Sequence, residues 1–102
     1  MHLTPDEKEA LKRDVVTSLK DEPEVRRIVI FGSFVHSDNP NDMDVAVFQD
    51  SAETYLPLAV KYRMKLDRVS DRIPLDVLPI RPNPPPSLFL REIEKGIVIY
   101  EG

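Results

Sequence analysis

Residues 28–48 read IVIFGSFVHSDNPNDMDVAVF, two apolar runs joined by a polar link. The first run ends at Gly32 and Ser33, and the second begins at Asp42 and Asp44. Short runs rich in β-branched residues and bounded by turn residues are typical of buried strands. A short link returns the second strand antiparallel to the first. We therefore predict that the Gly-Ser turn and both carboxylates gather at one end of a sheet.

Helical and strand patterns alternate through the rest of the chain. A capping box with proline at the first helical position predicts where the first helix begins. The predicted elements are a helix from Thr4 to about Lys20, strands over 27–31 and 42–48, a helix over 55–69 with a charged outer face, a strand over 73–80, a short helix from Ser87 to Lys95, and a short strand or tail over 97–100.

The long helical connection between the second and third strands predicts that they are parallel, with a right-handed crossover. These elements predict an α/β (α+β) fold, a small mixed β-sheet with helices packed on it. No repeat, second hydrophobic pattern or long linker divides the chain, so we expect a single domain over residues 1–102.

Three carboxylates are predicted to converge beside the Gly-Ser turn. Side chains alternate along a strand, so Asp42 and Asp44 share a face, and Asp76 joins them if the register allows. Asp76 stands between Leu75 and Val77, where burial is costly unless the carboxylate is paired or metal-bound. An edge strand facing water, or a salt bridge to an arginine, is the alternative explanation of this residue.

Clustered carboxylates raise one another's pKa, and a divalent cation removes that repulsion. Oxygen ligands suit Mg²⁺, and two such ions can clamp the attacking and leaving oxygens at a phosphorus atom. Gly32 allows the backbone to approach a phosphate, and Ser33 adds a hydroxyl and an amide donor. A Gly-Ser pair or an Asp-x-Asp pair alone is commonly turn chemistry, so the combination carries the inference.

Composition excludes several classes of protein. The 102 residues include no cysteine, so there is no disulfide framework or thiolate metal site. No apolar run approaches the roughly 18 residues of a membrane span, and the first residues lack a signal-peptide pattern, so we expect a cytoplasmic protein. The net charge of −4 argues against non-specific nucleic-acid binding.

At these residues the sequence resembles the minimal nucleotidyltransferases (MNT) of the DNA polymerase beta-like superfamily. The motifs are IVIFGS at 28–33, DMDVAVF at 42–48 and PLDVLPI at 74–80. The closing REIEKGIVIYEG at 91–102 is also similar to the end of these domains. The resemblance covers nearly the whole chain and implies a nucleotidyltransferase-like fold.

The resemblance also implies a function for each motif residue. Gly32 and Ser33 would contact a nucleoside triphosphate, while Asp42, Asp44 and Asp76 would hold Mg²⁺, expected as two ions. Asp76 could also accept the proton of the attacking hydroxyl. Many such proteins are antitoxins paired with a HEPN-domain toxin and transfer AMP to a tyrosine of that partner. The resemblance thus predicts a Mg²⁺-dependent protein adenylyltransferase that uses ATP.

Two departures from the family pattern keep an alternative open. The link over 34–41 is shorter than usual, and Phe34, Val35 and His36 stand where relatives often carry an arginine. The alternative is a catalytically weak or inactive module that neutralises a partner by contact. An RNA-tailing enzyme fits less well, because it needs a basic groove. The base preference and oligomeric state are not specified by the sequence.

Three basic residues of the predicted 55–69 helix, Lys61, Arg63 and Lys65, also have two interpretations. Any of them could reach a bound phosphate. A solvated helix face explains them equally well.

Overall fold

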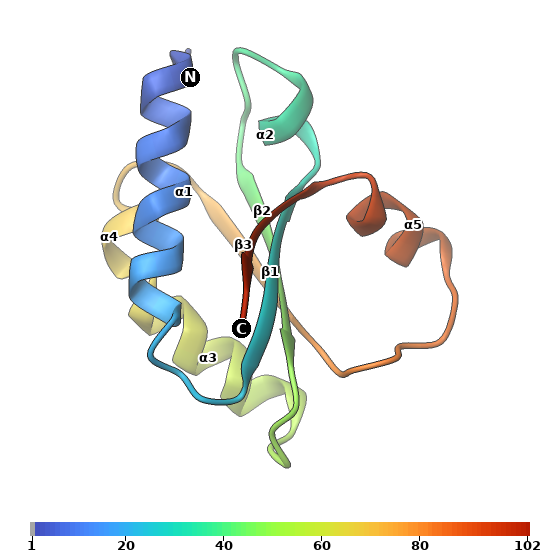
Figure 1. Ribbon diagram of the computed structural model, residues 1–102. Coiled ribbons are helices and arrows are strands. Elements are labelled where there is room, and N and C mark those ends of the chain that lie inside the picture. The colour runs from blue at the N-terminus through green and yellow to red at the C-terminus, as the bar shows by residue number, and fades with distance from the viewer. Residues whose placement is uncertain (1) are drawn as a thin grey trace.

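The computed structural model describes residues 2–102 and forms a four-stranded mixed sheet flanked by helices (Figure 1). In chain order the elements are α1 (Pro5–Leu19), β1 (Val25–Phe31), α2 (Ser33–His36), β2 (Met43–Gln49), α3 (Tyr55–Lys65), α4 (Asp67–Ser70), β3 (Leu75–Ile80), α5 (Leu88–Glu94) and β4 (Ile97–Glu101).

The strand order is β3-β2-β1-β4, which confirms the predicted mixed sheet. β1 runs antiparallel to β2 and to β4, whereas β2 and β3 are parallel and joined through α3 and α4. Both predicted strand pairings are therefore confirmed. The register places Asp44 opposite Phe31 on one side and opposite Asp76 on the other.

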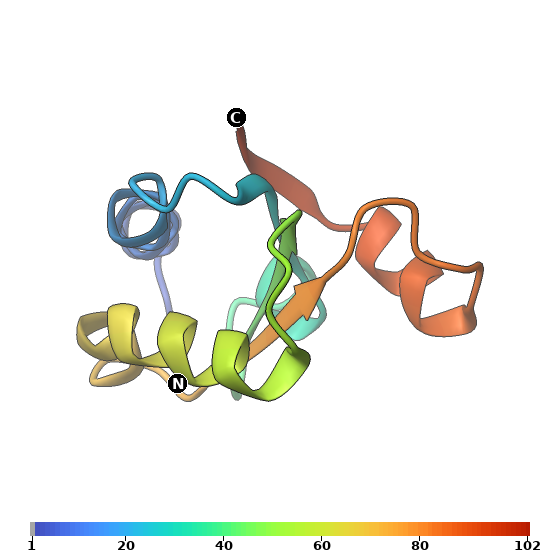
Figure 2. The same ribbon diagram turned by 90° about the horizontal axis from the view of Figure 1, so that it is seen from below.

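The two faces of the sheet are covered unequally. Helices α1, α3 and α4 lie on one face, and α5 with its proline-rich connector lies on the other (Figures 1 and 2). The larger core cluster fills the α1/α3 side, with residues such as Ile28, Val45 and Leu58 almost fully buried. A smaller cluster around Ala46 and Ile93 lies beneath α5. Because side chains alternate, Asp44 and Asp76 belong to the thinly covered α5 face.

The first helix begins as predicted. Thr4 accepts a hydrogen bond from the Glu7 amide at 3.1 Å, and the Glu7 carboxylate accepts one from the Thr4 amide at 3.0 Å. Lys8 then extends from α1 to α2, where its Nζ donates to the carbonyl oxygens of Phe34 at 2.6 Å and Ser37 at 2.5 Å. These bonds fix the one-turn helix that follows the Gly-Ser turn.

Several predicted boundaries were wrong. The helix predicted over 55–69 is two helices, because Leu66 leaves the α region at φ −94° and ψ 17°. The third strand begins at Leu75 rather than at residue 73, since Pro74 has no amide hydrogen and pairing with β2 begins at Leu75. The first strand begins earlier, at Val25. The closing segment is a strand, paired with β1.

The outer face of α3 is less polar than the sequence pattern predicted. Leu56, Val60 and Met64 recur at intervals of four and are 70%, 50% and 72% exposed. Residues at this spacing lie above one another on a helix. A stripe of apolar side chains therefore runs along the solvent side of α3, between its charged residues.

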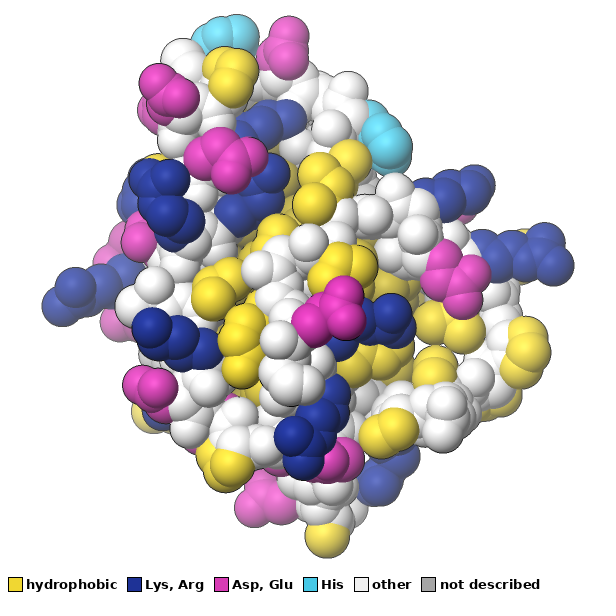
Figure 3. Space-filling model, in the orientation of Figure 1, with side chains coloured by type: hydrophobic (Ala, Val, Ile, Leu, Met, Phe, Trp, Pro, Cys, Tyr) yellow, Lys and Arg dark blue, Asp and Glu magenta, His cyan; other side chains and the backbone are white. Residues whose placement is uncertain are grey.

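On the face seen in Figure 3, Lys and Arg side chains alternate with Asp and Glu, and hydrophobic side chains show between them. This face carries no continuous basic surface of the kind that binds nucleic acid. Within residues 2–102, no helix combines the length and the apolar character needed to cross a membrane.

Candidate active site

The turn after β1 requires glycine for two reasons. Gly32 has φ +78°, a conformation that side chains disfavour, and a Cβ there would overlap Oδ2 of Asp44. The Gly32 carbonyl accepts from the Val35 amide at 3.1 Å, and the Ser33 carbonyl accepts from the Ser37 amide at 2.9 Å. The backbone therefore lies directly against the Asp44 carboxylate, with Ser33 exposed beside it.

The predicted convergence of the three carboxylates is confirmed. Asp42 lies just before β2, Asp44 lies on β2, and Asp76 is its register partner on β3. One oxygen atom from each of these residues lies within 4.8 Å of the others. Asp42 and Asp44 are half-buried, whereas Asp76 is exposed. What this cluster binds stays a prediction at this point.

The electrostatics of the cluster favour a cation. Partial burial raises the pKa of Asp44 to about 6, and repulsion by Asp42 and Asp76 and a hydrogen bond with Asp76 act in the same direction. The repulsion on a carboxyl group in such surroundings is relieved when the group keeps its proton or when a cation binds to it. The donors are all hard carboxylate oxygens, so the residues present fit Mg²⁺.

The structure corrects one premise about Asp76. Its side chain is 58% exposed on the edge strand β3, so no burial cost explains it. Its Oδ1 lies 3.6 Å from Nη2 of Arg63, a loose and solvated ion pair. Asp76 therefore lies on an edge strand and has an arginine partner, as the alternative explanation stated. It is also a member of the carboxylate cluster.

A cavity of about 370 Å³ opens beside the cluster. Its lining comes from β1, β2, β3, α3 and α5, and consists of Phe31, Asp44, Tyr55, Arg63, Asp76, Val77, Leu78 and Phe89. This cavity places two of the three carboxylates beside one arginine and several aromatic rings. A small molecule with an apolar end and with a cation at its other end, facing the two carboxylates, matches this lining.

The structure separates the three basic residues of α3. Nζ of Lys61 lies 2.7 Å from the Glu24 carboxylate, and Nζ of Lys65 lies 3.4 Å from that of Glu22. Both lysines therefore serve the junction between α3 and the segment before β1. Arg63 instead lines the cavity beside Asp76.

The family model described as "Polymerase beta, Nucleotidyltransferase" matches residues 13–102 of this chain. The chain belongs to this nucleotidyltransferase family. No curated protein matches it. The matched range includes the Gly-Ser turn and all three carboxylates.

Solved structures with the MNT fold are similar to the chain. The MntA–HepT toxin–antitoxin complex contains a chain with a TM-score of 0.62 and 17% identity, covering 92% of this chain and 73% of that one. A complex of the tri-AMPylated Shewanella oneidensis HEPN toxin with MNT antitoxin contains a chain with a TM-score of 0.59 and 18% identity. This match covers 93% of this chain and 73% of that one. At such low identity these matches establish the fold of a minimal nucleotidyltransferase.

The aromatic walls of the cavity beside the carboxylates were not predicted from the sequence. Tyr55 is the first residue of α3, and its side chain is 53% exposed. Phe89 is 52% exposed and meets the Phe31 ring edge-on, with centroids 5.8 Å apart. No local signal places Phe89 beside Asp44 and Asp76, because these residues line one cavity only when α5 folds back over the sheet.

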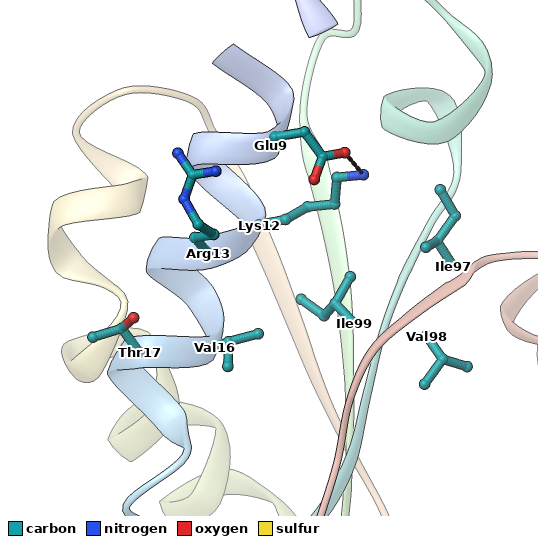
Figure 4. A pocket seen from close by; sticks show the side chains of 8 residues that line it. All are labelled: Glu9, Lys12, Arg13, Val16, Thr17, Ile97, Val98 and Ile99. Carbon is teal, nitrogen blue, oxygen red and sulfur yellow. Dashed lines mark ion pairs between the residues drawn. The ribbon is translucent and has the colours of Figure 1, made fainter. Parts of the chain in front are cut away.

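A second cavity of about 530 Å³ lies between α1 and β4 (Figure 4). Figure 4 shows Val16 and Ile99 in this groove, with the Glu9 carboxylate paired to Lys12 at 2.7 Å. Its lining includes one carboxylate, that of Glu9, which is paired with Lys12, and none of the five residues Gly32, Ser33, Asp42, Asp44 and Asp76. This groove is separate from the cavity beside the three carboxylates, which is called the carboxylate cavity below.

Proposed function

We propose that this protein is a Mg²⁺-dependent nucleotidyltransferase that moves AMP from ATP to a hydroxyl group of a partner protein. The observation that supports this most is the meeting of Asp42, Asp44 and Asp76 within 4.8 Å. Oδ2 of Asp44 also lies against the Gly32 turn, in a chain that belongs to the nucleotidyltransferase family. Arg63 supplies a positive charge at the same cavity.

The transfer is an in-line displacement at the α-phosphorus. The acceptor oxygen forms a bond to this phosphorus, the bond from phosphorus to the oxygen that bridges to the β-phosphorus breaks, and pyrophosphate leaves. The Asp76 carboxylate is exposed at the cavity and takes the proton of the acceptor hydroxyl.

Asp42, Asp44 and Asp76 would hold Mg²⁺, which supplies charge stabilisation to the phosphate oxygens when bound. The Ser33 amide and hydroxyl donate to the triphosphate, and Gly32 lets the triphosphate approach the backbone. Arg63 orients the charged end of the nucleotide.

We further propose that the acceptor is a tyrosine of a HEPN-type toxin, with this protein as the antitoxin. The support is the fold likeness to an MNT antitoxin in complex with a tri-AMPylated HEPN toxin. The chain has a net charge of −4, and a protein acceptor suits this acidic molecule better than a nucleic-acid primer does.

Incubating the protein with a HEPN-type toxin, Mg²⁺ and ATP tests the proposal. Mass spectrometry should then find AMP on a toxin tyrosine. Asp44→Asn should reduce the transfer rate by roughly a hundredfold or more, because it removes a metal ligand. Asp38→Asn, an exposed residue of the same link, is the matched control and should retain full activity. Equal transfer by Asp44→Asn would refute the proposal.

A second candidate function, neutralisation by contact alone, is favoured by the exposed apolar stripe of Leu56, Val60 and Met64. Such a stripe is typical of a surface that binds another protein. If contact suffices, Asp44→Asn should protect cells from the toxin as well as the wild type, and neutralisation in vitro should need neither ATP nor Mg²⁺.

A further inference from the structure

The carboxylate cavity continues into a smaller, apolar cavity. The apolar cavity has a volume of about 170 Å³ and shares Tyr55, Leu78 and Phe89 with the carboxylate cavity. Beyond these shared walls it runs along the end of β3 to the proline connector and α5, at Ile80 and Pro85. The two cavities therefore form one groove, with carboxylates and Arg63 at one end and apolar walls at the other.

We propose that the apolar end is the nucleobase subsite of this protein, in which Tyr55 and Phe89 present aromatic surface to the base. The inference rests on the proposed function and deepens it. The base is selected by stacking, so the site favours purines over pyrimidines and discriminates weakly between adenine and guanine.

The exposure of the two rings supports this assignment. Tyr55 is 53% exposed and Phe89 52%, although both are large apolar side chains at the mouth of a groove. The rings of Phe89 and Phe31 meet at an interplanar angle of 88°, so they do not stack face to face, and the half-exposed Phe89 keeps ring surface for another planar group. Stacking of a base on an aromatic side chain contributes about 1–3 kcal/mol.

The distribution of charge supports a nucleotide over an apolar peptide side chain. A ligand that fills both cavities meets Asp44, Asp76 and Arg63 at one end and rings and prolines at the other. A nucleoside triphosphate with its metal has this layout, with charge at one end and a flat aromatic group at the other. Apart from the Tyr55 hydroxyl, the polar side chain at the apolar end is Ser87, whose Oγ already accepts from the Leu90 amide at 3.0 Å. The side chains therefore offer little hydrogen bonding that could select one purine.

Calorimetric titration with two Mg²⁺-bound probes tests the proposal. The probes are inorganic tripolyphosphate and the α,β-methylene analogue of ATP, which cannot transfer AMP. Tyr55→Leu and Phe89→Leu remove a ring and keep apolar volume, so each should weaken analogue binding roughly five- to 150-fold. Tripolyphosphate binding should change less than twofold in both variants. Tyr55→Phe, which keeps the ring, should bind the analogue as the wild type does.

Leu88→Ala is the matched control for α5, because Leu88 is 79% exposed and lines neither cavity. If both Leu variants bind tripolyphosphate and also bind the ATP analogue as tightly as the wild type does, the inference is overturned. The proposed function would then still stand. Absence of binding by both probes would overturn the proposed function and the inference with it.

The guanosine analogue should bind within a few-fold of the adenosine analogue, and the cytidine analogue more weakly. Selection of adenine over guanine by tenfold or more would also overturn the inference.

Discussion

Glu24 and Asp44 are both withdrawn from water, but their surroundings have opposite effects. Glu24 lies before β1, where burial opposes its charge and is outweighed by hydrogen bonds from Lys61 and the Tyr62 hydroxyl, so its pKa is lowered. These bonds are 2.7 Å and 2.8 Å long. Asp44 faces two other carboxylates, and its pKa is raised to about 6. One carboxylate stabilises the fold, whereas the other is held at a cost to stability.

The difference follows the two faces of the sheet. The Glu24 cluster closes the larger core, where Tyr62 is fully buried and its pKa is raised by burial and by the Glu24 carboxylate. The Asp44 cluster lies on the face that α5 covers only in part. Clustered like charges are tolerated where a ligand can reach them, and this is typical of functional sites. The paired Glu24 cluster therefore lies on the side of the larger core, and the three clustered carboxylates lie on the other side of the sheet.

The largest expected effect is that of Glu24→Gln. The amide loses the charge that pairs with Lys61 and accepts from Tyr62, and the free energy of unfolding should fall by about 2–3 kcal/mol at pH 7. Because the pKa of Glu24 is lowered by folding, the wild type should lose this advantage as pH falls below the ordinary glutamate value of 4.5. Urea unfolding at pH 7 and pH 4 measures both. Glu53→Gln, an exposed control on the loop before α3, should change stability by less than about 0.5 kcal/mol.

The next effect is that of Gly32→Ala. The added Cβ is strained at φ +78° and overlaps Asp44, so unfolding should become easier by about 1–3 kcal/mol. The same change displaces a carboxylate, so the affinity for Mg²⁺ should fall as well. Ser33→Ala at the exposed neighbour should leave stability unchanged. Thermal unfolding with and without Mg²⁺ checks both effects, and a Gly32→Ala protein with wild-type stability would contradict the close packing of turn and carboxylate.

A smaller effect of opposite sign is expected for Asp44→Asn without metal. Removing the repelled charge should raise the free energy of unfolding by about 1 kcal/mol at neutral pH, a modest value because the carboxyl is partly solvated. This corresponds to a rise in Tm of about 4 °C. A carboxyl whose pKa is raised by folding binds its proton more tightly in the folded state. The free energy of unfolding of the wild type should therefore rise relative to that of the variant as the pH falls from above 6 toward the ordinary aspartate pKa of 3.8.

Metal should reverse this order. With Mg²⁺ and ATP the wild type should gain thermal stability and Asp44→Asn should not. Mg²⁺ affinity of the wild type should weaken below pH 6, where the metal competes with the proton on Asp44. Scanning calorimetry across pH 4–8 gives both results. An Asp44→Asn protein that is less stable than the metal-free wild type at pH 7 would show that the carboxylate is structural.

The smallest effect on stability is expected for Arg63→Gln. Its ion pair with Asp76 is 3.6 Å long and more than half exposed on both sides, so the change should be below about 0.5 kcal/mol. Binding of Mg²⁺-ATP should nevertheless weaken severalfold, because Arg63 lines the cavity. Lys65→Gln should instead lower stability more than Arg63→Gln does and should have little effect on nucleotide affinity. Equal nucleotide affinity in wild type and Arg63→Gln would remove this arginine from the site.

Local patterns were sufficient for most elements. The capping residues Thr4 and Ser87 were predicted from short motifs and make the expected hydrogen bonds. Boundaries failed where a local rule met a tertiary constraint, as at Leu66, where the chain leaves the helix and α4 still brings Val69 into the core. His36, in the link between the first two strands, is exposed and lies on the one-turn helix α2.

The sequence by itself determined the two strands, the turn between them and the common face of Asp42 and Asp44, because strand periodicity is a property of neighbouring residues. Only the tertiary structure decided that Asp76 stands opposite Asp44, because that register depends on how α3 and α4 return the chain. It also selected Arg63 over its lysine neighbours and brought Phe89 to the carboxylates. These are contacts between residues distant in sequence, and they form only when the sheet and α5 pack together.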